Sequence, residues 1–302
     1  MTIVCATHFT ISSSDATVVA AHLARRMKQK LWLVTVVPGV PLSTGRTSHR
    51  DKTVLDALHT EANVLRQEGL DVEVSLLHGK VDRALGKLCK DIDARLLVVG
   101  DSSQAHTSPF ATPVDRIASG VSVPLLVVHS MRPFEAWAKG ERALKVLLAI
   151  DQTWSSAVAR DWLAGLAAYG PLDLLATHLW VPADEHARRH GKTPMTPADE
   201  GAMAEELTSE AEATLRTLPN NVKWRVQLEV GRGNLGELLL QMAAREQVDV
   251  MVLGTHQRKG LLSRLTSTSH HVLADAIMSV ALVPAEPVEP KRERRPPEQP
   301  RH

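Results

Sequence analysis

The chain has 302 residues, of which 44% are hydrophobic and 23% charged, as in an ordinary globular protein. Its formal net charge is +1 and its aromatic content is 3%, which argues against nucleic acid as the main partner. It contains no apolar stretch near the roughly 18 residues that cross a bilayer, and it begins without an export signal. We therefore expect a cytoplasmic protein that does not bind membranes, with Cys5 and Cys89 buried and reduced.

Short apolar runs alternate with amphipathic segments along the chain. The first part predicts strands at 2–7, 31–37, 72–77, 95–100 and 123–129, and helices at 14–28, 52–68, 80–91 and 110–119. The second part predicts strands at 144–150, 172–179, 222–230, 249–254 and 279–284, and helices at 155–168, 197–217, 234–246 and 262–276. The strands are continuous Val, Leu and Ile runs, which favours parallel sheets covered by helices on both faces. Strand–helix–strand alternation therefore predicts an α/β fold with right-handed crossovers.

The second part of the chain repeats the first. The strand and Ser-rich turn at 3–14 return at 146–156, and the apolar run ending in Gly100 returns in the run ending in Gly254. A period of about 143–155 residues is too long for a solenoid and indicates a duplicated domain. We predict domains at 1–130 and 143–285, a linker at 131–142, and a disordered Pro- and charge-rich tail at 286–302.

The two predicted domains should pack against each other as an intramolecular pseudo-dimer. Their last strands, 123–128 and 279–283, are apolar and would otherwise be edges open to unwanted pairing. We therefore expect these strands to line a pseudo-twofold interface. The sequence leaves open whether two whole chains form a homodimer.

The segments that follow the first and fourth strands of each domain are the candidate site, because ligands bind where the strand order of a parallel sheet reverses. In the second domain these segments are Asp151 and Gly254–Ser267. Here the chain resembles the universal stress protein family, which typically reads Val-Asp-x-Ser after its first strand and G-x2-G-x9-G-[ST] after its fourth. Residues 1–130 and 143–285 both share the resemblance, so the chain is identified as a tandem member. This implies two open five-stranded parallel-sheet domains, Rossmann-like and similar to adenine nucleotide alpha-hydrolases.

The resemblance also implies a cradle for ATP or another adenine nucleotide in the second domain. Asp151 would accept a hydrogen bond from the adenine amino group, and Gly254 would let the backbone approach ribose and phosphates. Thr266 and Ser267, at the start of a helix, would cap a phosphate.

The loop of this cradle departs from the family pattern. Gln257 replaces the second glycine and Thr266 the third, and the loop is about one residue short. His256 belongs to the same loop, and basic side chains such as Arg258 would offset the missing backbone contacts.

The first domain departs further from the pattern. His8 stands where the adenine-binding aspartate would be, and the loop after Gly100 lacks the second glycine. Asp101 would add negative charge beside a phosphate, which is unfavourable. We therefore expect no nucleotide there.

Other patterns predict less. His8 with His106, and His186 with His190, have no third ligand, so we expect no metal and treat the second pair as solvated in a loop-like stretch, 183–192. The G-x-G-x-x-G match at 231–236 is best explained as a tight strand-to-helix turn, because no ribose-binding acid follows the next strand.

The chain contains no nucleophile elbow, H-E-x-x-H or P-loop motif, which favours a binding or regulatory module over an enzyme. Three hypotheses stay open. The first is a stress-response regulator whose nucleotide occupancy biases a surface that an unidentified protein partner recognises. The second is an interaction protein with both sites dead, and the third is a slow nucleotide hydrolase.

Overall fold

The computed structural model describes residues 2–39, 49–101, 113–191, 194–256 and 266–285. The described elements of the first half are β1 (Thr2–Ala6), α1 (Ile11–Met27), β2 (Lys30–Val37), α2 (His49–Gln67), β3 (Val72–His78), α3 (Val81–Asp91), β4 (Ala94–Gly100), α4 (Pro113–Gly120) and β5 (Leu125–Val128). Helix α5 (Arg132–Ala138) follows. Those of the second half are β6 (Leu144–Ala149), α6 (Trp154–Ala167), β7 (Leu172–Trp180), α7 (Pro182–His190), α8 (Pro197–Leu215), β8 (Val222–Val230), α9 (Leu235–Arg245), β9 (Val250–His256), α10 (Ser267–Asp275) and β10 (Ser279–Ala285).

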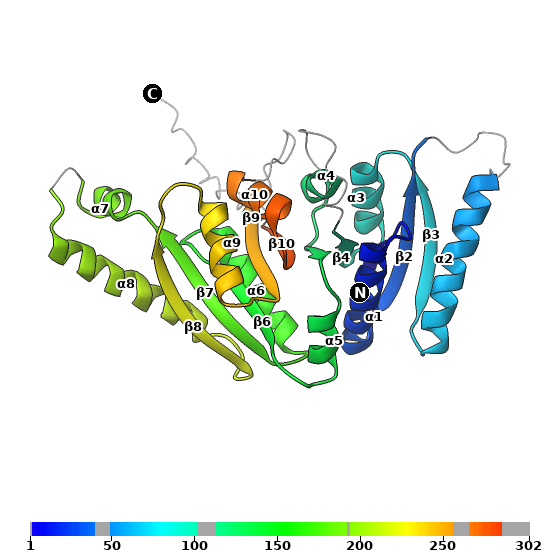
Figure 1. The fold of residues 1–302 in the computed structure, drawn as a ribbon, viewed down its shortest axis with the longest axis horizontal. Helices are drawn as coiled ribbons and strands as arrows, with labels where there is room; N and C mark the ends of the chain where they lie inside the picture. Colours follow the sequence, from blue (N-terminus) through cyan, green and yellow to red (C-terminus); the bar gives the residue numbers. More distant parts are fainter. Residues whose placement is uncertain (1, 40–48, 102–112, 192–193, 257–265, 286–302) are drawn as a thin grey trace, which may run out of the picture.

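The strands of both halves form one continuous sheet in the order β3-β2-β1-β4-β5-β10-β9-β6-β7-β8. Among the described strands, pairs within each half are parallel and only the β5–β10 pair at the centre is antiparallel, with Leu126 opposite Ala281. Figure 1 shows α2 and β3 at one end of the molecule and α7, α8 and β8 at the other. The predicted α/β fold is confirmed, and so is the prediction that the last strands of the two halves meet.

Each face of the sheet has its own apolar core, and each core runs through both halves. One contains residues of α1, α2, α5, α6 and α8, and the other contains residues of α3, α4, α9 and α10. Neighbouring strand residues alternate between them, as Ile3 and Val4 do, which is expected for strands covered on both sides. Cys5 and Cys89 are both free and buried, and burial raises the pKa of each thiol to about 12.

Helix α5 lies in the predicted linker and is part of the core. Its Trp137 is 1% exposed and donates a hydrogen bond from Nε1 to the carbonyl oxygen of Pro171 at 3.0 Å. The guanidinium of Arg26, in the first half, lies 5.7 Å from the Trp137 ring and donates to the carbonyl oxygen of Tyr169 in the second. The linker therefore joins the halves by packing as well as by chain connection.

The expectation of a loop at 183–192 was wrong, and of its two histidines only His190 is exposed. Residues 182–190 form α7, which has a proline in its first turn, acidic residues near its start and basic residues in its last turn. His186 is 5% exposed, and its ring centroid lies 5.0 Å from that of His190. The two rings therefore pack together on a helix.

Two further expectations concern membranes and the tail. Among the described helices, none combines the length and apolar composition that crossing a bilayer requires. The tail at 286–302 lies outside the described residues.

Candidate functional site

A cavity of about 230 Å³ opens at the carboxyl end of the sheet in the second half, where strand order reverses between β6 and β9. We name it the Gly254 cavity. It is larger than the roughly 150 Å³ cavity that accommodates a benzene molecule in another protein. Its lining residues come from β6, β7, β9, α6, α9 and α10 and the adjoining turns: Ala149, Ile150, Asp151, Ser155, Ser156, Thr177, Leu179, Leu235, Leu239, Leu253, Gly254, His256, Thr266, Thr268 and Ser269.

The turn that carries Asp151 is held by its own side chains. Asp151 Oδ1 accepts hydrogen bonds from the backbone N–H of Thr153, at 2.9 Å, and from its hydroxyl. The Asp151 N–H donates to Ser156 Oγ at 3.1 Å, and Thr153 caps α6 by accepting from the Ser156 N–H. One carboxylate oxygen of Asp151 is therefore structural, and the described residues provide no hydrogen-bond donor to Oδ2.

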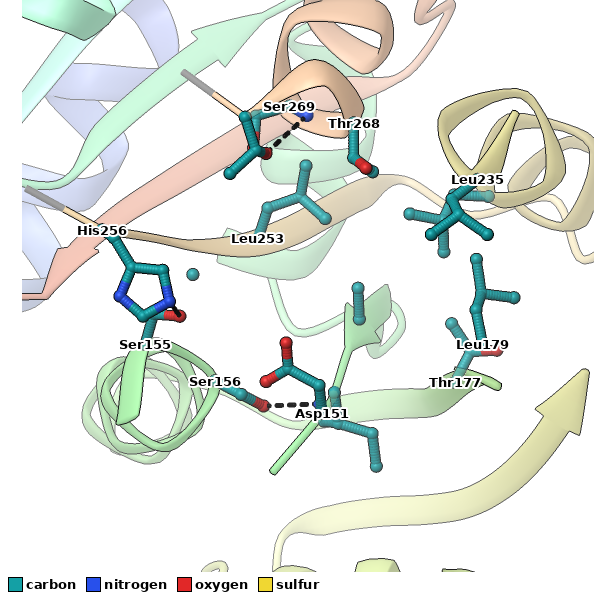
Figure 2. A pocket seen from close by; sticks show the side chains of 15 residues that line it. Asp151, Ser155, Ser156, Thr177, Leu179, Leu235, Leu253, His256, Thr268 and Ser269 are labelled. Atoms are coloured by element: carbon teal, nitrogen blue, oxygen red, sulfur yellow. Dashed lines mark hydrogen bonds between the residues drawn. The ribbon is translucent and has the colours of Figure 1, made fainter. Parts of the chain in front are cut away.

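A chain of side chains connects this turn to the end of β9. Thr153 Oγ1 lies 2.8 Å from Ser155 Oγ, which lies 3.2 Å from His256 Nε2. Figure 2 shows Asp151 pointing into the cavity, with His256 and Ser155 along one wall. The ends of β6 and β9 are thus joined through hydroxyl and imidazole groups.

The start of α10 provides a second group of hydroxyls. Thr266 caps this helix by accepting from the Ser269 N–H at 3.2 Å, and its Oγ1 lies 3.0 Å from Ser269 Oγ. Thr268 also lines the cavity. Because the N-termini of α6 and α10 both reach this cavity, their partial positive charge favours an anion there.

The opposite wall of the cavity is apolar. It includes Leu179 from β7 and Leu235 and Leu239 from α9. Figure 2 shows Leu235 and Leu179 across from His256, with Leu253 of β9 between the two sides. Sequence reasoning missed these residues. Two features of the sequence could have identified them. One is the run of leucines after the 231–236 turn, and the other is the alternation of side chains at the end of β7, which places every other residue on the same face of the sheet.

The structure brings most of the predicted binding residues to the Gly254 cavity. Asp151, Gly254, His256 and Thr266 all line it, whereas Ser267 lines a neighbouring depression between α9 and α10. Arg258 lies outside the described residues. The role of these residues in binding stays a prediction.

The first half repeats the turn without the carboxylate. Thr10 caps α1 by accepting from the Ser13 N–H, as Thr153 caps α6 by accepting from the Ser156 N–H. His8 Nε2 lies 3.2 Å from Thr10 Oγ1, so an imidazole takes the place of the Asp151 carboxylate. Most of the loop after Gly100, from 102 to 112 and including His106, lies outside the described residues.

Gly100 and Gly254 have the same structural role in the two halves, because each lies against the backbone of the first helix of its half. A Cβ added at Gly254 would collide with the carbonyl oxygen of Ser155, and one added at Gly100 would collide with that of Ser12. Each glycine therefore permits the close approach of the fourth strand to the first helix of its half.

Gly254→Ala and Gly100→Ala should each lower the free energy of unfolding by about 1–3 kcal/mol, because backbone must move to admit the methyl group. Gly165→Ala is the matched control. Gly165 lies within α6 with open space around its would-be Cβ, so alanine should leave stability unchanged or raise it by up to about 1 kcal/mol. Urea unfolding of the three variants measures these differences. Equal stability of Gly165→Ala and Gly254→Ala would contradict the close-approach explanation.

The remaining sequence motifs have structural explanations. The segment 231–236 joins β8 to α9 as a tight turn, with Asn234 Oδ1 accepting from the Gly236 and Glu237 N–H groups, as expected from its sequence. Within the described residues, no group of three or more His, Cys, Asp or Glu side chains is arranged to hold a metal ion.

Comparison with known proteins identifies the family. The model of the universal stress protein family matches residues 1–129 and 143–284, so the chain belongs to this family and carries two of its domains. A search of curated proteins found no significant match.

Solved structures of other proteins share the full tandem fold. A universal stress protein from Archaeoglobus fulgidus has 12% sequence identity and a TM-score of 0.65, and the match covers 94% of this chain and 98% of that one. A functionally unknown protein from Pseudomonas aeruginosa PAO1 has 16% identity and a TM-score of 0.62, covering 94% and 92%. At these identities the likeness shows the fold alone.

Proposed function

We propose that this chain is a cytoplasmic regulatory module that binds one adenine nucleotide, such as ATP, in the Gly254 cavity of its second half. The observation that carries the proposal is the meeting of Asp151, Gly254, His256 and Thr266 around a single cavity, although Asp151 is about a hundred residues distant from the others in sequence.

The cavity offers a different environment to each part of a nucleotide. Its apolar wall, which includes Leu179 and Leu235, suits a purine ring, and Asp151 Oδ2 is an acceptor for an exocyclic amino group. The hydroxyls of Thr266, Thr268 and Ser269, at the positive end of α10, suit phosphate oxygens. This division of apolar and hydroxyl-bearing surface supports a nucleotide over a simple anion.

We propose that the first half binds no nucleotide, because it lacks the corresponding groups. His8 offers an imidazole where the second half has a carboxylate, and it is already in contact with Thr10. Asp101, which follows β4, would repel a phosphate and pairs with His129 at 3.5 Å.

Binding rather than catalysis is the proposed activity. Ser155 and His256 form a hydroxyl–imidazole pair, which is the observation that most favours the alternative of a slow hydrolase. However, Ser155 is 4% exposed and its hydroxyl also contacts Thr153, so the pair is better explained as part of the wall. Nucleotide occupancy would then bias a surface read by a partner protein.

Mass spectrometry of small molecules released from the denatured, freshly purified protein tests the proposal. We expect an adenine nucleotide from the parent protein and much less from Asp151→Asn, which keeps the shape of the side chain but not its charge. Release of an unrelated metabolite, or equal nucleotide from both proteins, would contradict it.

A further inference from the structure

A second cavity lies on the other face of the sheet from the Gly254 cavity. Its volume is about 180 Å³, and it is enclosed by α6, α8, the turn after β6 and the end of β7. Along strand β7 the side chains alternate between the two, because Thr177 and Leu179 line the Gly254 cavity while His178, between them, lines this one. The two cavities adjoin at the turn after β6, where Asp151 lines both. We name it the His178 cavity.

The His178 cavity has an apolar body and a rim rich in hydrogen-bond acceptors. Ile150, Ala157, Leu207 and Ala211 supply the apolar surface. Carboxylates, an amide, hydroxyls and the imidazole stand around it, at Asp151, Gln152, Thr153, Glu210, Thr214 and His178. Its volume is close to the roughly 150 Å³ that accommodates one benzene ring in another protein.

The charge around this cavity is predominantly negative. Asp151 and Glu210 both line it, whereas its one lining guanidinium, Arg160, is paired with Asp161 at 2.7 Å. Glu210 Oε2 accepts a hydrogen bond from Gln152 Nε2 at 2.8 Å, which holds the carboxylate at the rim. Its Oε1 lies 3.6 Å from Nη2 of Arg189, a guanidinium that also pairs with Glu185 and Glu206.

His178 adds no positive charge at neutral pH. Burial lowers the pKa of its imidazole, and this effect outweighs the opposing influence of the carboxylates of Asp151, Glu185 and Glu210. The neutral ring offers one donor and one acceptor nitrogen to a ligand.

We propose that the His178 cavity is a second ligand site, which takes a small organic cation consisting of a single ring or short apolar body with an amine or amidine group. The apolar surface would bury the body, and the carboxylate of Glu210 would receive the cationic group in a charge-assisted hydrogen bond. This site adjoins the proposed nucleotide cavity at Asp151 and is distinguished from it by Glu210 and His178, which line this cavity alone.

The first half provides a matched comparison. The pattern Leu-x-x-Glu-Ala at 207–211 in α8 occurs also at 58–62 in α2. There the equivalent carboxyl, Glu61, is partly buried, and burial raises its pKa against the opposing influence of the Thr17 hydroxyl. Leu65 stands where α8 has Thr214. The first half thus keeps the glutamate but makes its surroundings more apolar.

Titration with benzamidine, followed by NMR of the histidine imidazoles, tests the proposal. We expect a saturable shift of the His178 resonance, with a Kd of about 1 mM or below. Glu210→Gln should weaken binding by about ten-fold, because it removes the charge from the acceptor. Glu61→Gln is the control in the first half and should leave the Kd unchanged. Benzyl alcohol, which has the ring without the cation, should bind at least about ten-fold more weakly.

A second variant tests the location. Ala211→Leu should fill the cavity from α8 and abolish the His178 shift while ATP binding persists. Several results would overturn the proposal: no saturation up to about 10 mM benzamidine, equal binding of benzyl alcohol, an unchanged Kd in Glu210→Gln, or a shift of His256 instead of His178.

Discussion

Replacing Asp151 with alanine should weaken ATP binding by about ten- to a hundred-fold, the loss expected for a charge-assisted hydrogen bond worth about 1.5–3 kcal/mol. The cause is the loss of the Oδ2 acceptor that faces the Gly254 cavity. Isothermal titration calorimetry of the parent and the variant measures the difference.

Two controls separate recognition from structural support. Because Asp151 Oδ1 also holds Thr153, alanine loosens the turn as well as removing the acceptor. Asp151→Asn keeps an oxygen for Thr153, so a comparable loss of affinity in this variant would point to the charge. His8→Ala changes the equivalent position of the first half and should have almost no effect. Equal losses in His8→Ala and Asp151→Ala would refute the asymmetry between the halves.

Replacing Trp137 with alanine should destabilise the whole chain by about 3–5 kcal/mol, the range found when a buried aromatic side chain is removed. Trp137 is 1% exposed, donates to Pro171 and lies beneath Arg26 from the other half. Because both apolar cores run through the two halves, we expect thermal unfolding to stay a single transition with a lower midpoint.

Trp154→Ala is the matched control for this prediction. Trp154 is 54% exposed at the start of α6, so its loss should change stability by no more than about 0.5 kcal/mol. If Trp137→Ala were equally mild, or if the two halves unfolded separately in the parent protein, the linker helix would not have the joining role that its contacts indicate.

Much of the fold was predictable because its signals are local. Strands that are apolar at every position, such as 95–100 and 250–254, would expose apolar side chains to water if one face of the sheet were open, so they predict helices on both faces. The repetition of these strands in the same order indicates two copies of one unit. Helix α8 begins at Pro197, at the position that its Thr196 cap and following acids predict.

The sequence did not predict helices α5 and α7, and the reason differs between the two. Helix α5 has only seven residues, too few to show a helical period, and its stability depends on the burial of Phe134 and Trp137 by distant segments. Helix α7 has a start signal at Pro182, but its nine residues include no large apolar side chain, so the sequence shows no helical period there.

The candidate site was predictable only in part, because the sequence motifs identify the polar residues of the Gly254 cavity and not its apolar ones. Asp151 and Gly254 follow strands at the reversal of strand order, so topology brings them together. The leucines of α9 and the second cavity beyond His178 arise from packing between segments that are far apart in sequence, and no local pattern encodes that packing. The pairing of β5 with β10 was likewise expected from exposed apolar edges, but the single sheet that results depends on the register of both halves.

The stoichiometry of ATP binding to the parent protein, measured by calorimetry, tests the central claim most directly. If the second half has a nucleotide site and the first half has none, one nucleotide should bind per chain. Two nucleotides per chain, or no detectable binding at about 1 mM ATP, would contradict it.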